Sequence, residues 1–210
     1  MLRVNVGCGG TPTPGWINFD NSLSVLIASA PGASWLTALL RRTRGDFVRK
    51  AKTNGIRWAS ATKLPLADAS AEVVYTSHML EHMEKIAARR FLAEARRVLA
   101  PRGVLRVVVP DLQRKVATYV EQGDADLFLE STLLSSDVPC TLAQRVRFVA
   151  LGTRGHVWMY DARSLIRLLK LAGFVEIAAV APGETRIENP GPLDLAERAE
   201  ESIYVEASKP

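Results

Sequence analysis

The sequence predicts an α/β fold built on a mainly parallel sheet with helices on both faces. Two observations predict it. Short apolar runs rich in β-branched residues alternate with amphipathic segments along the chain, and the first run leads directly into a glycine-rich turn, GCGG at 7–10. Strands that alternate with helices form parallel sheets whose faces the helices cover. With 210 residues, the chain is expected to form one domain, 1–210, with a substantial core.

The first third of the chain contains three predicted strands separated by one insertion. The strands are LRVNV (2–6), WINFD, which ends at Asp20, and EVVY (72–75). A helical insertion is predicted over about 22–55, closing at IRW (56–58). Residues 22–40 carry no charge, but a central Pro31-Gly32 and several hydroxyl side chains argue against a membrane span.

The rest of the chain continues the alternation. One apolar stripe runs along the segment 84–99, which predicts an amphipathic helix that stops at Pro101, and a second such helix begins at Asp161 and ends at Gly173. The predicted elements in order are helix 84–99, strand 104–110, a helical insertion over about 111–157 that would act as a lid, helix 161–174, and strands 175–180 and 203–207.

The composition indicates which partners and which cellular compartment are expected for the protein. The net charge is +5, and the basic residues gather in 41–52 and 145–148. This charge is modest and no stacking motif interleaves with it, so nucleic acid is not expected as a partner. Two cysteines and no leader-like apolar run at the start predict a reducing, cytoplasmic setting. The sequence is compatible with three roles for the 22–55 insertion. It could form a lid, a contact in a homodimer, or a peripheral contact with a membrane.

The glycine turn and the acid that follows it predict a nucleotide site. Gly7 and Gly9 come directly after the first strand, where missing side chains let a ligand approach the backbone closely. Asp20 ends the next strand, where its carboxylate can accept hydrogen bonds from both ribose hydroxyls of an adenosine. The dinucleotide fingerprint G-x-G-x-x-G is not met, because Pro12 stands at its last position.

Five segments together resemble successive motifs of class I S-adenosylmethionine-dependent methyltransferases. They are NVGCGGTPTPGWINFD, LPLADASAEVVYTSHMLEHM, RRVLAPRGVLRVVVPDL, HVWMYDARSLIRLLKLAGF and IYVEASKP. The chain is most similar to small enzymes that methylate polysaccharides or glycolipids, among them the sugar O-methyltransferases of mycobacterial methylated mannose polysaccharides. The resemblance implies a Rossmann-like methyltransferase fold with a mainly parallel seven-stranded sheet and a C-terminal antiparallel hairpin.

The resemblance also implies a set of cofactor-binding residues. The methionine part of S-adenosylmethionine would lie on the glycine turn, its ribose on Asp20 and its adenine near residues 60–61. Ser77, just after the predicted strand EVVY (72–75), would complete the site. The implied residues are Gly7, Cys8, Gly9, Asp20, Ser60, Ala61 and Ser77. Two positions depart from the family pattern, since Ser60 and Asn5 stand where many relatives carry acids. Both substitutions predict a weaker hold on the cofactor.

The stretch SHMLEHM (77–83) contains H-x-x-E-H, which predicts chemistry at the reaction centre. On a helix, His78, Glu81 and His82 would share one face. The stretch is similar to the E-x-x-E-H of RNA 3′-end and quinone-pathway methyltransferases, which binds a divalent metal, and His156 is expected to be the distant fourth ligand. Three imidazoles favour manganese, iron or zinc over magnesium. Such a metal would orient neighbouring sugar hydroxyls and lower their pKa.

Alternatives remain at these positions. Glu81 and His82 also suit a structural strand-to-helix junction, and His78 or His156 suits a general base without metal. Asp111 is expected either to bind an acceptor hydroxyl as a catalytic residue or to cap the following helix.

The leading hypothesis is methyl transfer to a sugar hydroxyl of a glycan or glycolipid precursor. The alternatives are methylation of a small phenolic or quinone-like metabolite, a zinc metalloprotease with H-x-x-E-H on a helix, and a cofactor-binding regulatory module without activity.

Overall fold

The computed structural model describes residues 1–29, 49, 51–134 and 155–210. Its strands and helices confirm the predicted alternation, and most bounds differ by only a few residues. The elements are β1 Leu2–Val6, β2 Ile17–Asp20, α1 Leu23–Ser29, β3 Arg57–Trp58, β4 Ala71–Ser77, the 3₁₀ helix η1 Leu80–His82, α4 Lys85–Val98, β5 Leu99–Pro110, α5 Leu112–Gln122, α6 Ala125–Thr132, α8 Ala162–Leu171, β6 Val175–Val180 and β7 Ser202–Ser208.

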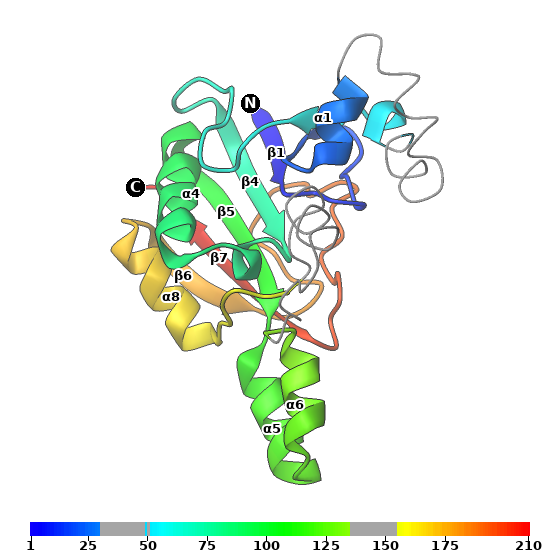
Figure 1. Ribbon diagram of the computed structural model, residues 1–210. Coiled ribbons are helices and arrows are strands. Elements are labelled where there is room, and N and C mark those ends of the chain that lie inside the picture. The colour runs from blue at the N-terminus through cyan, green and yellow to red at the C-terminus, as the bar shows by residue number, and fades with distance from the viewer. Residues whose placement is uncertain (30–48, 50, 135–154) are drawn as a thin grey trace.

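The strands described form one seven-stranded sheet in the order β3-β2-β1-β4-β5-β7-β6 (Figure 1). The first five are mutually parallel, whereas β7 is antiparallel to both β5 and β6. From β1 the chain moves outward to β2 and β3, then returns to β4 on the other side of β1. The strand order therefore reverses between β1 and β4, and ligands of such sheets bind at the carboxyl ends of the strands at this switch point.

Helices α4 and α8 pack on one face of the sheet (Figure 1). Helix α4 buries its predicted apolar stripe there, and α8 buries Leu165 and Leu169. The Asp161 side chain caps α8 as predicted, accepting a hydrogen bond from the Ser164 amide at 2.6 Å. Gly173 follows the helix with φ +82°, a conformation that glycine adopts at little cost.

The opposite face of the sheet differs from the first in the part of the chain that the structure describes. Among the described residues it is covered by irregular chain, with Trp16, Ile187 and Leu193 packed on Tyr75 and Tyr204. The sequence explains the difference. PTPG follows the glycine turn, and 181–192 contains three prolines and two glycines, so neither segment sustains a helix. We call residues 181–201, between β6 and β7, the C-terminal segment.

A row of polar side chains crosses this second face. Asn5 of β1 pairs in register with Tyr75 of β4, Tyr75 with Arg106 of β5, and Arg106 with Glu206 of β7. Residues paired across neighbouring strands point to the same face of a sheet. Arg106 and Glu206 are fully buried, and Arg106 Nη1 lies 2.6 Å from Glu206 Oε1. The C-terminal segment closes over this row, because Arg106 also donates to the carbonyls of Glu184 and Leu195.

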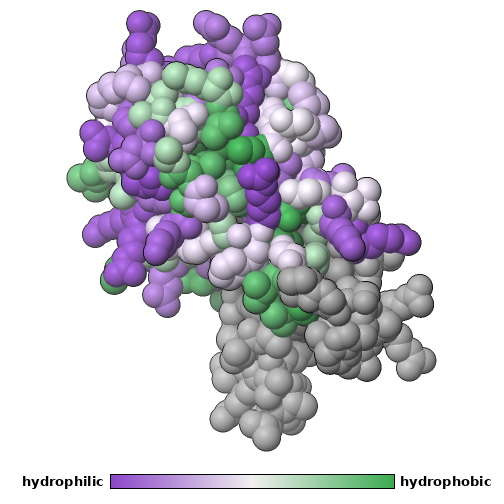
Figure 2. All heavy atoms as spheres, turned by 90° about the horizontal axis from the view of Figure 1, so that it is seen from above, coloured by the Kyte–Doolittle hydropathy of each residue, from purple (hydrophilic) through white to green (hydrophobic). Residues whose placement is uncertain are grey.

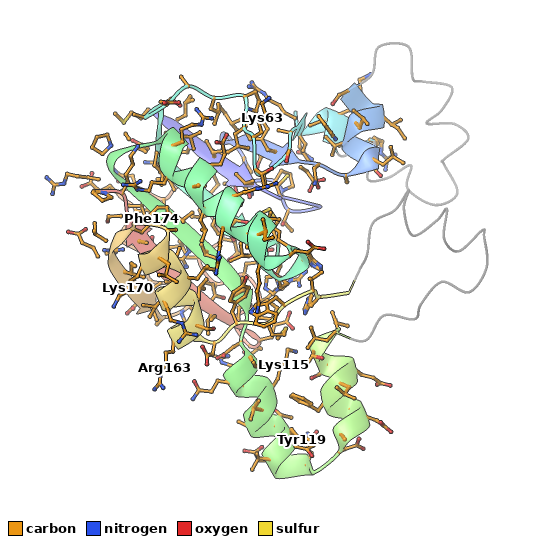
Figure 3. All side chains as sticks on the ribbon, turned by 60° about the vertical axis from the view of Figure 1, so that its left-hand side comes forward. Lys63, Lys115, Tyr119, Arg163, Lys170 and Phe174 are labelled. Carbon is orange, nitrogen blue, oxygen red and sulfur yellow. The ribbon has the colours of Figure 1, made fainter. Side chains whose placement is uncertain are left out.

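The two predicted insertions are described in part. Helix α1 belongs to the first, whose residues 30–48 and 50 lie outside the described part of the chain. Helices α5 and α6 belong to the second and form a hairpin that projects from the body, with Tyr119 packed on Phe128 at 5.2 Å between ring centroids (Figures 1 and 3). The lid was predicted for the insertion over about 111–157, and its residues 135–154 lie outside the described part of the chain. No helix within the described ranges is long and apolar enough to cross a membrane.

Candidate active site

The glycine turn is folded tightly against β2 and the end of β4. The amides of Gly7 and Cys8 both donate to the Phe19 carbonyl, and the Gly9 amide donates to Asp20 Oδ2 at 3.0 Å. These three amides are therefore bonded within the protein. What the turn offers a ligand is close approach to the backbone rather than free donors. Burial, with a contribution from Asp20, raises the pKa of Cys8 to about 12, so its thiol stays protonated.

Gly7 is required by conformation and by space. Its φ is +72°, and a Cβ added there would lie 2.5 Å from Met79 Sδ and 2.9 Å from Met79 Cβ. Gly7→Ala is expected to lower the free energy of unfolding by about 2–3 kcal/mol, from left-handed strain plus crowding. Gly10→Ala is the matched control, because its Cβ would meet nothing within 4 Å, and it should change stability by less than about 0.5 kcal/mol. Urea denaturation measures both, and equal effects would contradict the assignment.

Asp20 stands at the carboxyl end of β2 beside this turn. Its Oδ2 accepts from the Gly9 amide, and its Oδ1 accepts from the Ser22 amide at 2.8 Å. Asp20 is 9% exposed as a residue, and each carboxylate oxygen keeps a further lone pair for a hydroxyl donor. The position thus suits the ribose role that was predicted for it.

The adenine positions lie next to Asp20, since the Ala59 amide donates to the Asp20 carbonyl. Ser60 Oγ shares a 2.9 Å hydrogen bond with Thr62 Oγ1, and Ala61 is buried. Asn5, where many relatives carry an acid, donates to the carbonyl of Thr11 and to Thr13 Oγ1. Asn5 therefore holds the loop after the glycine turn in place and brings no charge to it.

The H-x-x-E-H stretch is not an α-helix, which corrects the sequence prediction. Ser77 ends β4, and His78 adopts φ +49°, a left-handed conformation in which the chain leaves the strand and turns. A single 3₁₀ turn, η1, follows, and α4 begins only at Lys85. The H-x-x-E-H side chains therefore converge through a turn and not through helical spacing.

Glu81 is the centre of the resulting cluster. Its carboxylate is fully buried, and within the described part of the chain neither oxygen accepts a hydrogen bond. Glu81 Oε1 lies 4.0 Å from His82 Nε2 and 3.9 Å from His156 Nε2. The ligand atoms of these three residues all lie within 4.8 Å of one another, so the structure brings together three of the four predicted metal ligands.

Backbone hydrogen bonds hold the distant histidine in this cluster. The amides of Val157 and Trp158 both donate to the Glu81 carbonyl, and the His156 amide donates to the carbonyl of Leu133. Burial lowers the pKa of His156, while the Glu81 carboxylate acts in the opposite direction. Its imidazole is therefore mainly neutral near pH 7, with a lone pair available to a metal or a proton.

His82 has a defined tautomer in this geometry. Its Nδ1 lies 3.0 Å from the Gly155 carbonyl, which can only accept, so Nδ1 carries the proton. The lone pair is then on Nε2, the nitrogen that faces Glu81. Metal-binding histidines commonly donate their other ring N–H to a carbonyl in this way.

His78, the fourth predicted ligand, contacts the C-terminal segment and the start of β7. Its Nε2 lies 2.9 Å from Ser202 Oγ, and its Nδ1 lies 3.2 Å from Arg198 Nη1 and 3.3 Å from Glu81 Oε1. The Arg198 guanidinium has only donors, so Nδ1 accepts from it. Both ring nitrogens of His78 are thus occupied by protein groups.

Asp111 serves as the cap of α5, one of its two predicted roles. Its Oδ1 accepts from the Gln113 amide at 2.9 Å, and its own amide donates to the Glu201 carbonyl. Its part in binding an acceptor hydroxyl stays a prediction.

Sequence reasoning missed two residues at this site, Glu197 and Arg198. Glu197 reaches Tyr75 and Thr11, and Arg198 reaches His78, all near the switch point. Both residues lie in the polar, mainly acidic C-terminal segment. The one sequence feature that could have indicated a role for them was the unusual length of this loop between two paired strands.

The sheet order, its antiparallel last pair and the glycine turn at the switch point define the Rossmann-like methyltransferase fold. Residues 4–107 match the sequence profile of the family described as methyltransferase domain. Comparison with curated proteins gave no match.

Among the solved structures that share the fold are two methyltransferases. One is an S-adenosylmethionine-dependent methyltransferase from Thermotoga maritima, described as a possible histamine N-methyltransferase, with a TM-score of 0.55 and 18% identity over 100% of this chain and 82% of that one. The other is a candidate methyltransferase from Bacillus halodurans, with a TM-score of 0.51 and 15% identity over 99% of this chain and 91% of that one.

The match over residues 4–107 and the shared fold support an S-adenosylmethionine-dependent methyltransferase, in agreement with the predicted fold and enzyme class. The metalloprotease alternative does not hold, because it required H-x-x-E-H on a helix.

Proposed function

We propose that this methyltransferase acts on a sugar hydroxyl of a glycan or glycolipid precursor, with a divalent metal held by Glu81, His82 and His156. The observation that carries the proposal is the Glu81 carboxylate, which is fully buried without a hydrogen-bond donor among the described residues. A buried charge that lacks a partner is costly, and a bound cation would compensate it.

The donor set fits a transition metal. Two ligand atoms about 2.1 Å from the same ion lie at most about 4.2 Å apart, and the Glu81 oxygen lies 3.9 and 4.0 Å from the two imidazole nitrogens. One carboxylate with two imidazoles favours manganese, iron or zinc over magnesium. His78 is better described as a neighbour of this set, because its Nδ1 already accepts from Arg198.

The methyl transfer itself requires few protein groups besides the proposed metal ligands. The acceptor oxygen forms a bond to the methyl carbon, the electron pair of the sulfur–carbon bond returns to sulfur, and the hydroxyl proton leaves to solvent. A divalent ion would lower the pKa of the acceptor hydroxyl and fix its direction. Asp20 and the glycine turn hold the methyl donor, and Met79, packed on Gly7, links that turn to the cluster. The two reactants are thereby brought together in one orientation.

A sugar acceptor suits the surroundings of the cluster. Trp158 is 41% exposed, and its amide is bonded to the Glu81 carbonyl. Indole faces pack well on the C–H surfaces of sugar rings. Neighbouring sugar hydroxyls also offer two oxygens to one ion. A phenolic or quinone-like metabolite would use the same donors, so the acceptor must be tested directly.

The test is a transfer assay with isotopically labelled S-adenosylmethionine and matched acceptors. We expect manno-oligosaccharides and glycolipid precursors to be labelled in the presence of manganese or zinc, with simple phenols and quinols labelled at least about 10-fold less. Trp158→Ala should raise KM for the sugar with little change in KM for the cofactor. Preferential labelling of phenols would contradict the sugar proposal and leave the enzyme class intact.

A further inference from the structure

The C-terminal segment places two oppositely charged neighbours across the switch point. Glu197 points to the glycine-turn side, where its Oε1 accepts from Thr11 Oγ1 at 3.3 Å and its Oε2 accepts from the Tyr75 hydroxyl at 2.8 Å. Arg198 points to the opposite side, with Nη1 3.2 Å from His78 Nδ1. The chain turns sharply between them, because Arg198 adopts φ +55°.

The contacts of Glu197 join the two strands between which the cofactor binds. Thr11 belongs to the loop after β1, and Tyr75 lies on β4 in register with Asn5 of β1. The carboxylate therefore spans β1 and β4 at their carboxyl ends, where this class of sheet binds its ligand. Its position is held from behind, since the Tyr204 hydroxyl donates to the Glu197 carbonyl.

The sequence around the glycine turn contains no acidic residue before Asp20. Between Arg3 and Asp20 the chain has no charged residue, and Asn5 presents amide donors to the loop. Asp20 uses both of its oxygens on backbone amides, at the side of the turn toward β2. The methionine part of the cofactor carries an α-ammonium group, which needs acceptors and is bound more strongly by a charged one.

We propose that Glu197 supplies this acceptor and binds the α-ammonium group of S-adenosylmethionine. The carboxylate comes from the far end of the chain and compensates for the neutral Asn5 on β1. The inference rests only on the enzyme class, and it is independent of the proposed metal and sugar acceptor.

The test compares three adenosine ligands by calorimetry without metal or acceptor. S-adenosylmethionine and S-adenosylhomocysteine both carry the α-ammonium group, whereas 5′-methylthioadenosine has the adenosine but no amino-acid part. Glu197→Gln keeps the shape and removes the charge. We expect it to weaken the first two ligands about 10-fold and to leave the third unchanged. Asp20→Ala should weaken all three, because all three carry the ribose.

Tyr75→Phe is the control for a purely structural role. It removes the hydrogen bond that ties Glu197 to β4 but keeps the carboxylate, so it should change the binding of the first two ligands by less than about 3-fold. Three results would overturn the inference: unchanged affinities in Glu197→Gln, an equal loss for all three ligands, or the Glu197→Gln pattern reproduced by Tyr75→Phe. Unchanged thermal midpoints in both variants establish that folding is not the cause.

Discussion

Glu81→Gln is expected to abolish stoichiometric binding of manganese or zinc and to lower methyl transfer at least about 100-fold. The carboxylate is the only anionic member of the three-residue cluster, and its oxygen faces both imidazole nitrogens within 4.0 Å. Replacing it with a neutral amide removes the charge that attracts the ion, and it also removes the ion's effect on the acceptor hydroxyl. Metal analysis after dialysis and initial rates measure the two losses.

The same variant should change stability in opposite directions with and without metal. In the apoprotein, the variant removes a buried charge without hydrogen-bond donors in the described residues, so the free energy of unfolding should rise by about 1–3 kcal/mol. With manganese present, the wild type gains stability by mass action and the variant does not. Glu84→Gln is the matched control. It lies three residues on, exposed and without a side-chain cap bond, so none of these quantities should change.

Two outcomes would contradict the metal assignment. One is activity that survives chelator treatment, and the other is a Glu81→Gln variant with wild-type rates. The reaction would then depend on a protein base, for which His156 is suited because burial lowers its pKa and keeps it neutral. In that case His156→Ala should lower the rate without any change in bound metal.

The order and type of most elements could be predicted because local patterns decide them. Continuous apolar runs became β4 and β5, and the stripes on 84–99 and 161–174 became α4 and α8. The glycine turn follows β1 and Asp20 ends β2 as predicted, and the carboxyl ends of these parallel strands lie at one edge of the sheet.

The local geometry of the cluster could not be predicted in this way. Spacings of three and four residues fit a helix, a 3₁₀ turn and a junction equally well, and the left-handed conformation of His78 decided between them. That conformation is set by tertiary contacts, including the hydrogen bond from the His78 amide to the Val108 carbonyl of β5. The C-terminal segment was likewise beyond local reasoning, because its hydrogen bonds reach residues more than 70 positions away in sequence.

Glu206→Gln is expected to lower the free energy of unfolding by about 3–5 kcal/mol. Glu206 and Arg106 are both fully buried and form a 2.6 Å ion pair in the polar row of the sheet. Removing one charge leaves the other buried without its counterion, which costs more than the pair itself contributes. The exposed pair of Arg97 and Asp68 has the same 2.6 Å separation, but Asp68 is 79% exposed. Asp68→Asn should therefore cost less than about 1 kcal/mol.

The Glu206→Gln substitution should also weaken cofactor binding, because the buried ion pair holds the C-terminal segment. Glu206 accepts from Thr185 Oγ1 and the Arg186 amide, and its partner Arg106 donates to the Leu195 carbonyl, two residues before Glu197. At a temperature where Glu206→Gln remains folded, S-adenosylhomocysteine should bind more weakly and 5′-methylthioadenosine unchanged, as in Glu197→Gln. Equal affinities for both ligands in wild type and variant, despite the stability loss, would show that the buried pair supports the sheet alone. A selective loss would show that the ion pair also positions the segment that carries Glu197.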